Sequence, residues 1–349
     1  MVWLHLNLNQ HFYNAALSNF YLFSLCYMKI LVTGGAGFIG SHVVKKLIGL
    51  GHKVVVVDNF NNYYEPRLKR DRVKIFLRGL KFKVYEIDIA DYKKLERIFK
   101  KEKFDKIIHL AAQAGVRYSL ENPFVYAETN IVGTLNLLEL ARHYKVKDFI
   151  YASSSSVYGN NKNLPFKESD RVDEPISLYA ATKKSTELLA YTYHHLFGIN
   201  TVGLRFFTVY GPWGRPDMAL FKFTKNIIEG KEIEVYGQGA MDRDFTYIDD
   251  IVAGIIGTLK VKSGYEIFNL GNSRPEKLMK MIGLIEKNVG KKAKIKMLPM
   301  QAGDVRKTYA DIKKAKKQLG YQPRINLEEG IRRFVEWYRE YYEQKTRSN

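Results

Sequence analysis

Short apolar runs alternate with segments of helical spacing between residue 28 and about residue 207. The expected strands are Lys29–Thr33, Lys53–Val57, Phe82–Ile87, Lys106–Leu110, Asp148–Ala152 and Thr201–Phe207. The expected helices between them are Phe38–Leu50, Asp91–Lys100, Asn122–His143 and Ser177–Leu196. Strands that are apolar throughout and alternate with helices indicate a parallel sheet covered on both faces. The pattern predicts an α/β protein with a doubly wound parallel sheet.

The rhythm changes after about residue 207, where segments become shorter and turn residues cluster. Gly211-Pro-Trp-Gly214 and Tyr236-Gly-Gln-Gly239 are typical of turns. A last helix is expected to begin at Asn326-Leu-Glu-Glu329, because an Asn followed by acidic residues is a helix start signal. We expect one domain over residues 28–207, with possible return segments near 248–271. Residues 208–349 mainly form a smaller C-terminal domain.

The first 27 residues differ from the remainder of the chain. Met1–Met28 contains no Lys, Arg, Asp or Glu, so it lacks the basic region of a secretory signal. Polar residues interrupt its apolar stretches, so no run of about 20 apolar residues could span a bilayer. We expect the fold to begin at Met28 and residues 1–27 to be a leader outside it. The alternative is a peripheral membrane anchor.

Composition narrows the class of protein. Hydrophobic residues make up 46% of the chain, which is enough for a large core and excludes disorder as the main description. The single cysteine, Cys26, excludes a disulfide scaffold and favours a reducing compartment such as the cytoplasm. The eight histidines show no ligand spacing, so no metal is expected. His109 follows an apolar run and is interpreted as a core or crevice histidine.

The net charge is +20, from 56 Lys and Arg against 36 Asp and Glu, and it suggests three kinds of partner. Nucleic acid, a membrane surface and an anionic substrate all attract a basic protein. The basic residues are spread along the chain with acidic residues among them, which favours a solvated surface. No signature of a nucleic-acid-binding module occurs. A nucleic-acid-binding protein on a dinucleotide fold remains the remote alternative, and we expect neither nucleic acid nor membrane as partner.

A glycine-rich turn joins the first strand to the first helix. Gly34, Gly37 and Gly40 have the spacing that permits a sharp turn, close approach to a pyrophosphate and tight packing of helix on strand. Asp58 ends the next strand, where a carboxylate accepts bonds from a ribose hydroxyl and repels a 2′-phosphate. The sequence therefore predicts a Rossmann-like domain that binds NAD in preference to NADP. The alternative is that the glycines serve turn geometry only.

A tyrosine and a lysine lie four residues apart on a predicted helix. Tyr179 and Lys183 therefore share one helix face. A free tyrosine is a poor base at neutral pH, but an adjacent cation and a positive nicotinamide ring favour the phenolate. Such a tyrosine can remove a proton from a sugar hydroxyl while hydride leaves the same carbon. The order of the motifs gives this pair its weight, since the chain has 24 tyrosines.

Serines follow the strand that precedes this helix. Tyr151-Ala-Ser-Ser-Ser-Ser-Val-Tyr-Gly159 places hydroxyls at the carboxyl edge of the sheet, where ligands bind in such folds. One of these hydroxyls could share the hydrogen bond to the reacting oxygen. The alternative is a loop of small polar residues without a chemical role.

Together these residues resemble the extended short-chain dehydrogenase/reductase family, and within it the nucleotide-sugar epimerases, most closely those acting at C4 of UDP-glucuronate. The resemblance runs from Met28 nearly to the C-terminus. The other supporting stretches are His109–Ser119, Asn130–Thr134, Leu204–Asp217 and Asp242–Asp250. It implies hydride transfer from C4 to NAD, rotation of the 4-keto sugar, and return of the hydride to its other face. It also implies a homodimer, and the two long helices carry apolar surface that suits packing between subunits.

The resemblance assigns roles to particular residues. Tyr179 is the base, Lys183 its partner and a cofactor ligand, and Ser154 the helper hydroxyl. Gly34, Gly37, Gly40 and Asp58 hold NAD, with Asp88 and Ile89 near its adenine. Thr208 lies beside the sugar diphosphate, Arg243 grips the diphosphate and Asp304 binds the uridine ribose. Gln301 stands where galactose-type enzymes carry arginine, which favours a uronate substrate over glucose.

A uronate substrate adds a demand, because a 4-keto uronate is a β-keto acid that loses CO2 readily. The carboxylate must be held out of line with the carbonyl, and Arg215 is the expected clamp, since its planar fork matches a carboxylate. The alternative is a surface arginine. Ser155 and Ser156 could add hydrogen bonds. Related decarboxylases and dehydratases carry glutamate where Ser156 stands, which argues against both. An epimerase of UDP-glucose or an N-acetylated UDP-sugar stays open as the alternative.

Overall fold

A computed structural model describes residues 27–262, 264–301 and 303–346, with side chains to residue 342. Its main feature is a seven-stranded sheet, in which every neighbouring pair is parallel. The strands in spatial order are β10 (Tyr265–Leu270), β6 (Asn200–Phe206), β5 (Asp148–Ser154), β4 (Lys106–His109), β1 (Lys29–Thr33), β2 (Lys53–Asp58) and β3 (Lys83–Glu86). This is the predicted doubly wound, Rossmann-like arrangement. The expected leader, except Tyr27, lies outside the described residues.

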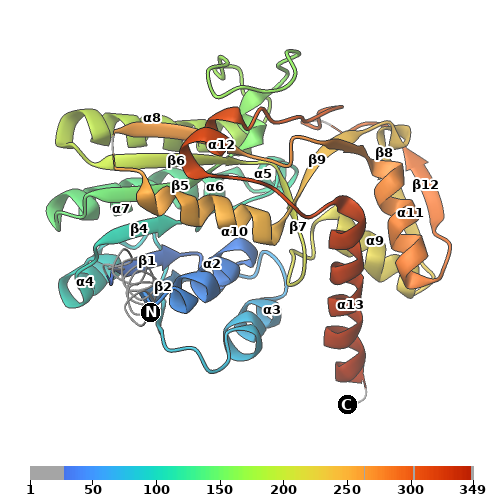
Figure 1. The fold of residues 1–349 in the computed structure, drawn as a ribbon, viewed down its shortest axis with the longest axis horizontal. Coiled ribbons are helices and arrows are strands. Elements are labelled where there is room, and N and C mark those ends of the chain that lie inside the picture. The colour runs from blue at the N-terminus through green and yellow to red at the C-terminus, as the bar shows by residue number, and fades with distance from the viewer. Residues whose placement is uncertain (1–26, 263, 302, 347–349) are drawn as a thin grey trace, which may run out of the picture.

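Helices cover both faces of the sheet, as Figure 1 shows. On strand β1, Ile30 and Val32 join one apolar core and Leu31 joins the other, because successive side chains point to opposite faces. The helices against the first core include α2 (Phe38–Gly49) and α10 (Ile248–Gly257), and those against the second are α4 (Tyr92–Glu102), α7 (Gly133–His143) and α8 (Leu178–Phe197). Burial on both faces explains why the inner strands are largely apolar, whereas the edge strand β3 is mostly exposed and contains Lys83 and Glu86.

Two helical segments differ from the sequence prediction. The expected helix Asn122–His143 is divided into α6 (Pro123–Tyr126), a π-helical stretch over Ala127–Val132, and α7. Asn130 lies in the π stretch and is buried. Its side-chain oxygen accepts the Gln113 backbone N–H, and its side-chain nitrogen donates to the Gln113 carbonyl oxygen. The helical segment of α3 (Pro66–Asp71) and the following π turn was not predicted, because its many basic residues leave no apolar stripe.

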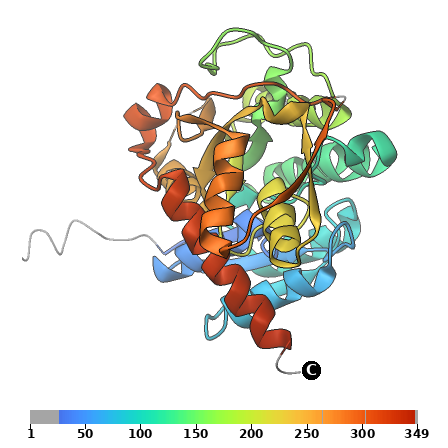
Figure 2. The ribbon, with the colours of Figure 1, turned by 90° about the vertical axis from the view of Figure 1, so that its right-hand side faces the viewer.

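Elements after residue 207 build a second, smaller lobe beside the carboxyl ends of the sheet (Figure 2). A three-stranded sheet has the order β11 (Pro275–Lys277), β9 (Asp242–Tyr247), β7 (Thr208–Tyr210), and a parallel pair joins β12 (Lys294–Leu298) to β8 (Glu232–Tyr236). Their helices are α9 (Ala219–Ile228), α11 (Leu278–Val289) and α13 (Leu327–Thr346), while α12 (Lys313–Leu319) packs against β10. The chain therefore returns to the large sheet through α10 and β10.

None of the helices in the described part of the chain combines the length and apolar character that crossing a membrane would require.

Candidate active site

A cavity of about 1000 Å³ lies between the large sheet and the second lobe. Fourteen of the residues singled out from the sequence line it: Gly34, Gly37, Gly40, Asp58, Ile89, Ser154, Ser155, Ser156, Tyr179, Lys183, Thr208, Arg215, Arg243 and Asp304. Asp88 and Gln301 do not. The Asp88 carboxylate accepts bonds from the Asn59 amide and the Ala90 backbone N–H instead. The fold thus gathers residues that are distant in sequence into one crevice.

The glycine turn is fitted to its place by close contacts. Gly34 has φ +70°, and a Cβ there would lie 2.7 Å from the Ala111 backbone nitrogen. A Cβ on Gly40 would lie 2.0 Å from the Gly34 carbonyl oxygen. Gly37 precedes α2 as its N-cap with no side-chain cap, so the first N–H groups of the helix face the cavity edge. Such a helix start favours an anion.

Asp58 ends β2 at the bottom of the same crevice. Its carboxylate accepts the backbone N–H of Ala36 at 3.1 Å and that of Phe60 at 2.9 Å. Burial raises the pKa of Asp58, while these bonds and the nearby Lys69 oppose the rise. The bond to Ala36 ties the end of β2 to the glycine turn, so both features of a dinucleotide site are held in one network.

Tyr179 and Ser154 meet at the end of β5. Ser154 caps the short turn that follows this strand, accepting the Ser156 backbone N–H at 3.1 Å and the Ser156 hydroxyl at 2.9 Å. Burial raises the pKa of Tyr179, and both the hydrogen bond with Ser154 and the charge of Arg215 act to lower it. Ser154 and Arg215 thus both favour the ionised form of this half-buried phenol, and burial opposes it.

Lys183 lies one helical turn further along α8. Its ammonium donates to the Ala152 carbonyl oxygen at 2.8 Å, which fixes it beside the end of β5. Burial lowers the pKa of Lys183 to about 8, against the opposing charge of Glu187. The same helix begins at the N-cap Ser177, whose side chain accepts the Ala180 N–H. The cap and the carbonyl contact together fix the face that presents Tyr179 and Lys183.

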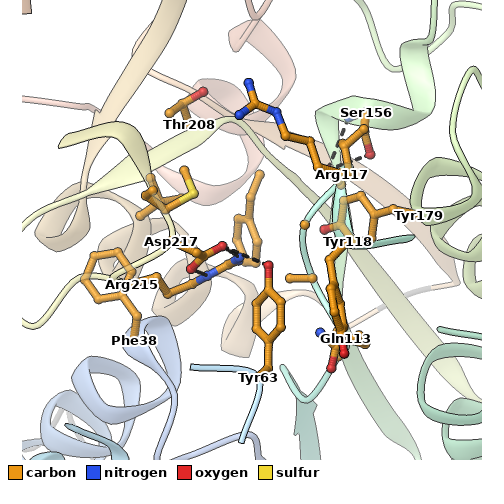
Figure 3. Close-up of a pocket in the computed structure, with 18 of the residues that line it drawn as sticks. Phe38, Tyr63, Gln113, Arg117, Tyr118, Ser156, Tyr179, Thr208, Arg215 and Asp217 are labelled. Carbon is orange, nitrogen blue, oxygen red and sulfur yellow. Dashed lines mark hydrogen bonds and ion pairs between the residues drawn. The ribbon is translucent and has the colours of Figure 1, made fainter. Parts of the chain in front are cut away.

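Arg215 carries an ion pair that the sequence reasoning did not anticipate. Its Nε donates to Asp217 at 3.0 Å and its Nη2 donates to the other carboxylate oxygen. Tyr63, from the loop between β2 and α3, donates to that second oxygen at 3.0 Å. Figure 3 shows the three side chains converging in the cavity, with Tyr179 across from them. With its side chain 22% exposed, Arg215 is thus a half-buried cation that lines the cavity, not a surface arginine.

The outer part of the cavity combines residues from both lobes. Arg117 donates to Asp304 at 3.2 Å and its guanidinium lies 4.4 Å from the ring centre of Tyr236. Arg243 donates to the backbone oxygens of Asp242 and Arg306, and burial lowers its pKa. These cations and aromatic rings could receive a base and its phosphates.

Sequence reasoning missed Tyr63, Asp217 and Arg117 as site residues. Asp217 and Arg117 lie inside stretches that carry the family resemblance, so position within those stretches was a usable signal. Tyr63 had none, because it reaches Asp217 across 154 residues of sequence.

Comparison with known proteins identifies the family of the chain and gives the same fold. The family described as GDP-mannose 4,6 dehydratase matches residues 31–334. A UDP-glucuronate 4-epimerase from Thermodesulfobacterium geofontis is 50% identical over 311 residues, which cover 89% of this chain and 96% of that protein. These findings show that the chain belongs to this family of epimerases and dehydratases related to short-chain dehydrogenases/reductases.

Solved structures are similar over nearly the same residues. The crystal structure of UDP-glucuronic acid 4-epimerase from Bacillus cereus, in complex with UDP-glucuronic acid and NAD, has a TM-score of 0.85 and 37% identity, covering 90% of this chain and all of that one. The UDP-glucose 4-epimerase of Thermotoga maritima with UDP-glucose has a TM-score of 0.82 and 38% identity, covering 90% and 99%. Overall similarity therefore does not separate a uronate from a neutral sugar.

Proposed function

We propose that this chain is an NAD-dependent UDP-sugar 4-epimerase that interconverts UDP-glucuronate and UDP-galacturonate. The observation that carries the choice of sugar is Arg215, a half-buried guanidinium lining the cavity that Tyr179 also lines. A uronate brings a carboxylate for which this fork is suited, whereas a neutral hexose does not. The similarity to both kinds of epimerase supports the reaction class.

The residues present fit NAD. The turn at Gly34 and Gly40 has no room for a Cβ, and the N-terminus of α2 offers unpaired N–H groups to a pyrophosphate. Asp58 supplies a carboxylate for a ribose hydroxyl, and Lys183 lies further along the crevice. When bound, NAD supplies the hydride acceptor and donor of the reaction. Asp88 and Ile89 stay our proposal for the neighbourhood of the adenine.

The remaining steps belong to the chain's own side chains. Tyr179 takes the proton of the C4 hydroxyl as C4 is oxidised, and Ser154 shares the hydrogen bond to that oxygen. The 4-keto sugar then turns to present its other face, and as C4 is reduced on that face its oxygen takes the proton back from Tyr179. Arg243 and Thr208 anchor the diphosphate and Asp304 the uridine ribose, so that residues 208–349 mainly bind the UDP-sugar while residues 28–207 mainly bind NAD.

Decarboxylation is the competing outcome for a 4-keto uronate. Arg215, with Ser155 and Ser156, holds the carboxylate in an orientation in which its bond to C5 is not aligned with the carbonyl π system. That bond therefore does not break and CO2 is not lost. Ser156 donates to Ser154 at 2.9 Å, so a hydroxyl stands where related dehydratases carry glutamate. The site therefore lacks at that position the acid that a dehydratase or a decarboxylase uses, which favours epimerisation.

The protein acts as a homodimer in this proposal. Helices α6 to α8 carry large apolar side chains that are exposed, namely Phe124, Val132, Leu135, Leu188, Tyr191, Leu196 and Phe197. Because α8 packs beside α7 and the π stretch, these side chains can form one face for a second copy. A Leu188→Glu variant that stays dimeric in sedimentation would contradict this choice of face.

Product analysis tests the reaction and the sugar together. The purified chain is incubated with UDP-glucuronate, UDP-glucose and UDP-N-acetylglucosamine separately, and products are identified by NMR. We expect UDP-galacturonate without CO2, and a Tyr179→Phe variant that retains NAD but not turnover. An enzyme that epimerises UDP-glucose and leaves the uronate unchanged would refute the sugar in favour of the neutral-sugar alternative. Full activity of Tyr179→Phe would refute the mechanism.

A further inference from the structure

The geometry points to Tyr63 and Asp217 as positioning residues that orient Arg215 and share its charge, so that a sugar carboxylate is gripped yet free to turn during epimerisation. This inference rests on the proposed function, because it concerns how the same cavity handles a uronate. Asp217 occupies the Nε–Nη2 edge of the guanidinium and Tyr63 closes the network on the carboxylate. A substrate carboxylate would then approach from the Nη1 side of the fork.

The network is built from three separate segments. Tyr63 comes from the loop that begins directly after Asp58, and it donates to Asp217, the partner of Arg215. Its ring lies 4.9 Å from that of Tyr118 and 5.9 Å from the Arg215 guanidinium. Gly115 has φ +108°, and a Cβ there would lie 2.5 Å from the Tyr63 hydroxyl. The surroundings of Tyr63 thus confine its hydroxyl to the position beside Asp217.

The protonation states keep the network in one form. Burial and the charge of Asp217 raise the pKa of Tyr63 well above its ordinary value, so the hydroxyl remains a donor. Burial acts to raise the pKa of Asp217, but Arg215 and Tyr63 outweigh it and the pKa is lowered. Asp217 is therefore a carboxylate and Arg215 a cation across the working pH range.

Sharing the charge has a consequence for catalysis. A half-buried arginine without an acidic partner would bind a uronate strongly before, during and after the rotation of the 4-keto sugar. Such uniform binding lowers KM without accelerating the reaction, and it opposes any step in which the sugar must move. Asp217 competes with the substrate carboxylate for the same guanidinium. The affinity for the uronate is therefore lowered, while the orientation of the guanidinium is kept. Asp217 also reduces the positive field that Arg215 exerts on Tyr179.

The test compares Asp217→Asn with wild type on two substrates. With UDP-glucuronate we expect KM to fall about tenfold and kcat to fall by a similar factor, the size of one charged hydrogen bond. The acid limb of the kcat profile should move to lower pH, because the less neutralised Arg215 lowers the pKa of Tyr179. With UDP-glucose, if it is turned over, both constants should stay within about twofold. Asp217→Glu, which keeps the charge, should restore the wild-type pH profile.

Tyr63→Phe keeps the inference testable if Asp217→Asn folds poorly, since it removes a single hydroxyl. It should change KM and kcat for the uronate in the same directions but less. The matched control is Tyr64→Phe, which removes the neighbouring hydroxyl that bonds Arg72 and leaves the Asp217 network intact. Tyr64→Phe should leave the acid limb of the pH profile of kcat unchanged.

Two results would overturn the inference. One is an unchanged Asp217→Asn enzyme. The other is a loss of kcat with KM and the acid limb unmoved, which indicates a purely structural role. A wild-type enzyme inactive on the uronate would instead refute the proposed substrate, and the inference with it; the wild-type control alone reveals that case.

Discussion

A buried ion pair lies behind the Tyr179–Lys183 face of helix α8. Glu187 and Arg205 form two bonds of 2.9 Å, and their side chains are 1% and 3% exposed. The Ser153 hydroxyl donates to Glu187 at 2.6 Å, and the ring of Tyr158 lies 4.8 Å from the guanidinium. Because Ser153 is in β5, the pair joins the helix that carries the proposed base to the strand end that carries the serines.

Glu187→Gln removes the negative charge and leaves Arg205 buried without its counter-charge. Breaking one partner of a buried ion pair costs about 3–5 kcal/mol in the free energy of unfolding. Glu187 also opposes the burial that lowers the pKa of Lys183 to about 8, so its loss should lower that pKa further. If activity needs the protonated lysine, the alkaline limb of the kcat profile should move to lower pH.

Urea denaturation and pH profiles measure the two effects separately. Glu187→Gln, Arg205→Met and the double variant form a thermodynamic cycle with wild type. Removing both charges together should restore most of the lost stability, since apolar replacement of a whole buried pair is often neutral. A double variant no more stable than Glu187→Gln would show that the unpaired arginine is not the cause. An alkaline limb that stays in place in Glu187→Gln would refute the link to Lys183.

Three further substitutions test the cofactor turn and the core. Gly40→Ala should lose copurified NAD, because its Cβ would lie 2.0 Å from the Gly34 carbonyl oxygen. Chromatography of the released cofactor measures the loss. The control is Gly49→Ala in the same helix, which has open space around it and should retain NAD. Glu102→Gln should cost about 2 kcal/mol of unfolding free energy at neutral pH, because the buried carboxylate pairs with Lys29 and Lys83 and accepts the Tyr85 hydroxyl. Since the pKa of Glu102 is lowered to about 2 from 4.5, its contribution is full above pH 4.5, and urea titrations should show the difference shrinking as pH falls below that value. Asp244→Asn should cost about 3 kcal/mol in the same assay, because its carboxylate accepts three backbone N–H groups and an amide would turn a donor toward them.

Most of the large sheet could be predicted because parallel strands are buried on both faces. All six strands expected from apolar runs are present, with bounds that differ by a few residues. The seventh, β10, was anticipated only as a return segment, since pairing with β6 across more than 60 residues leaves no local mark. The short strands β7 and β11 contain three residues each, too few for a period to be recognised.

The site residues that motifs could predict are those whose role depends on local geometry. Gly34 and Gly40 lie close together within a single turn. Tyr179 and Lys183 lie on the same face of a single helix. The charge environment of Tyr179 depends on tertiary structure instead. Spacing suggested Lys183 as the nearby cation, yet its ammonium donates to a backbone carbonyl. The charge that opposes the rise in the pKa of Tyr179 caused by burial is that of Arg215, which follows residue 207.

This arrangement couples the proposed base to the proposed carboxylate clamp. The Arg215 guanidinium donates to Asp217, and its charge acts to lower the pKa of Tyr179, so one guanidinium affects a carboxylate and a phenol at once. A uronate bound to it would add a second carboxylate and reduce the positive field at Tyr179. The hydrogen bond from Ser154 does not depend on that charge and would then carry more of the control of the tyrosine proton. In this proposal a substrate carboxylate takes part in the acid–base chemistry of the cavity, and a substitution at Arg215 that alters selectivity for the sugar should also alter the base.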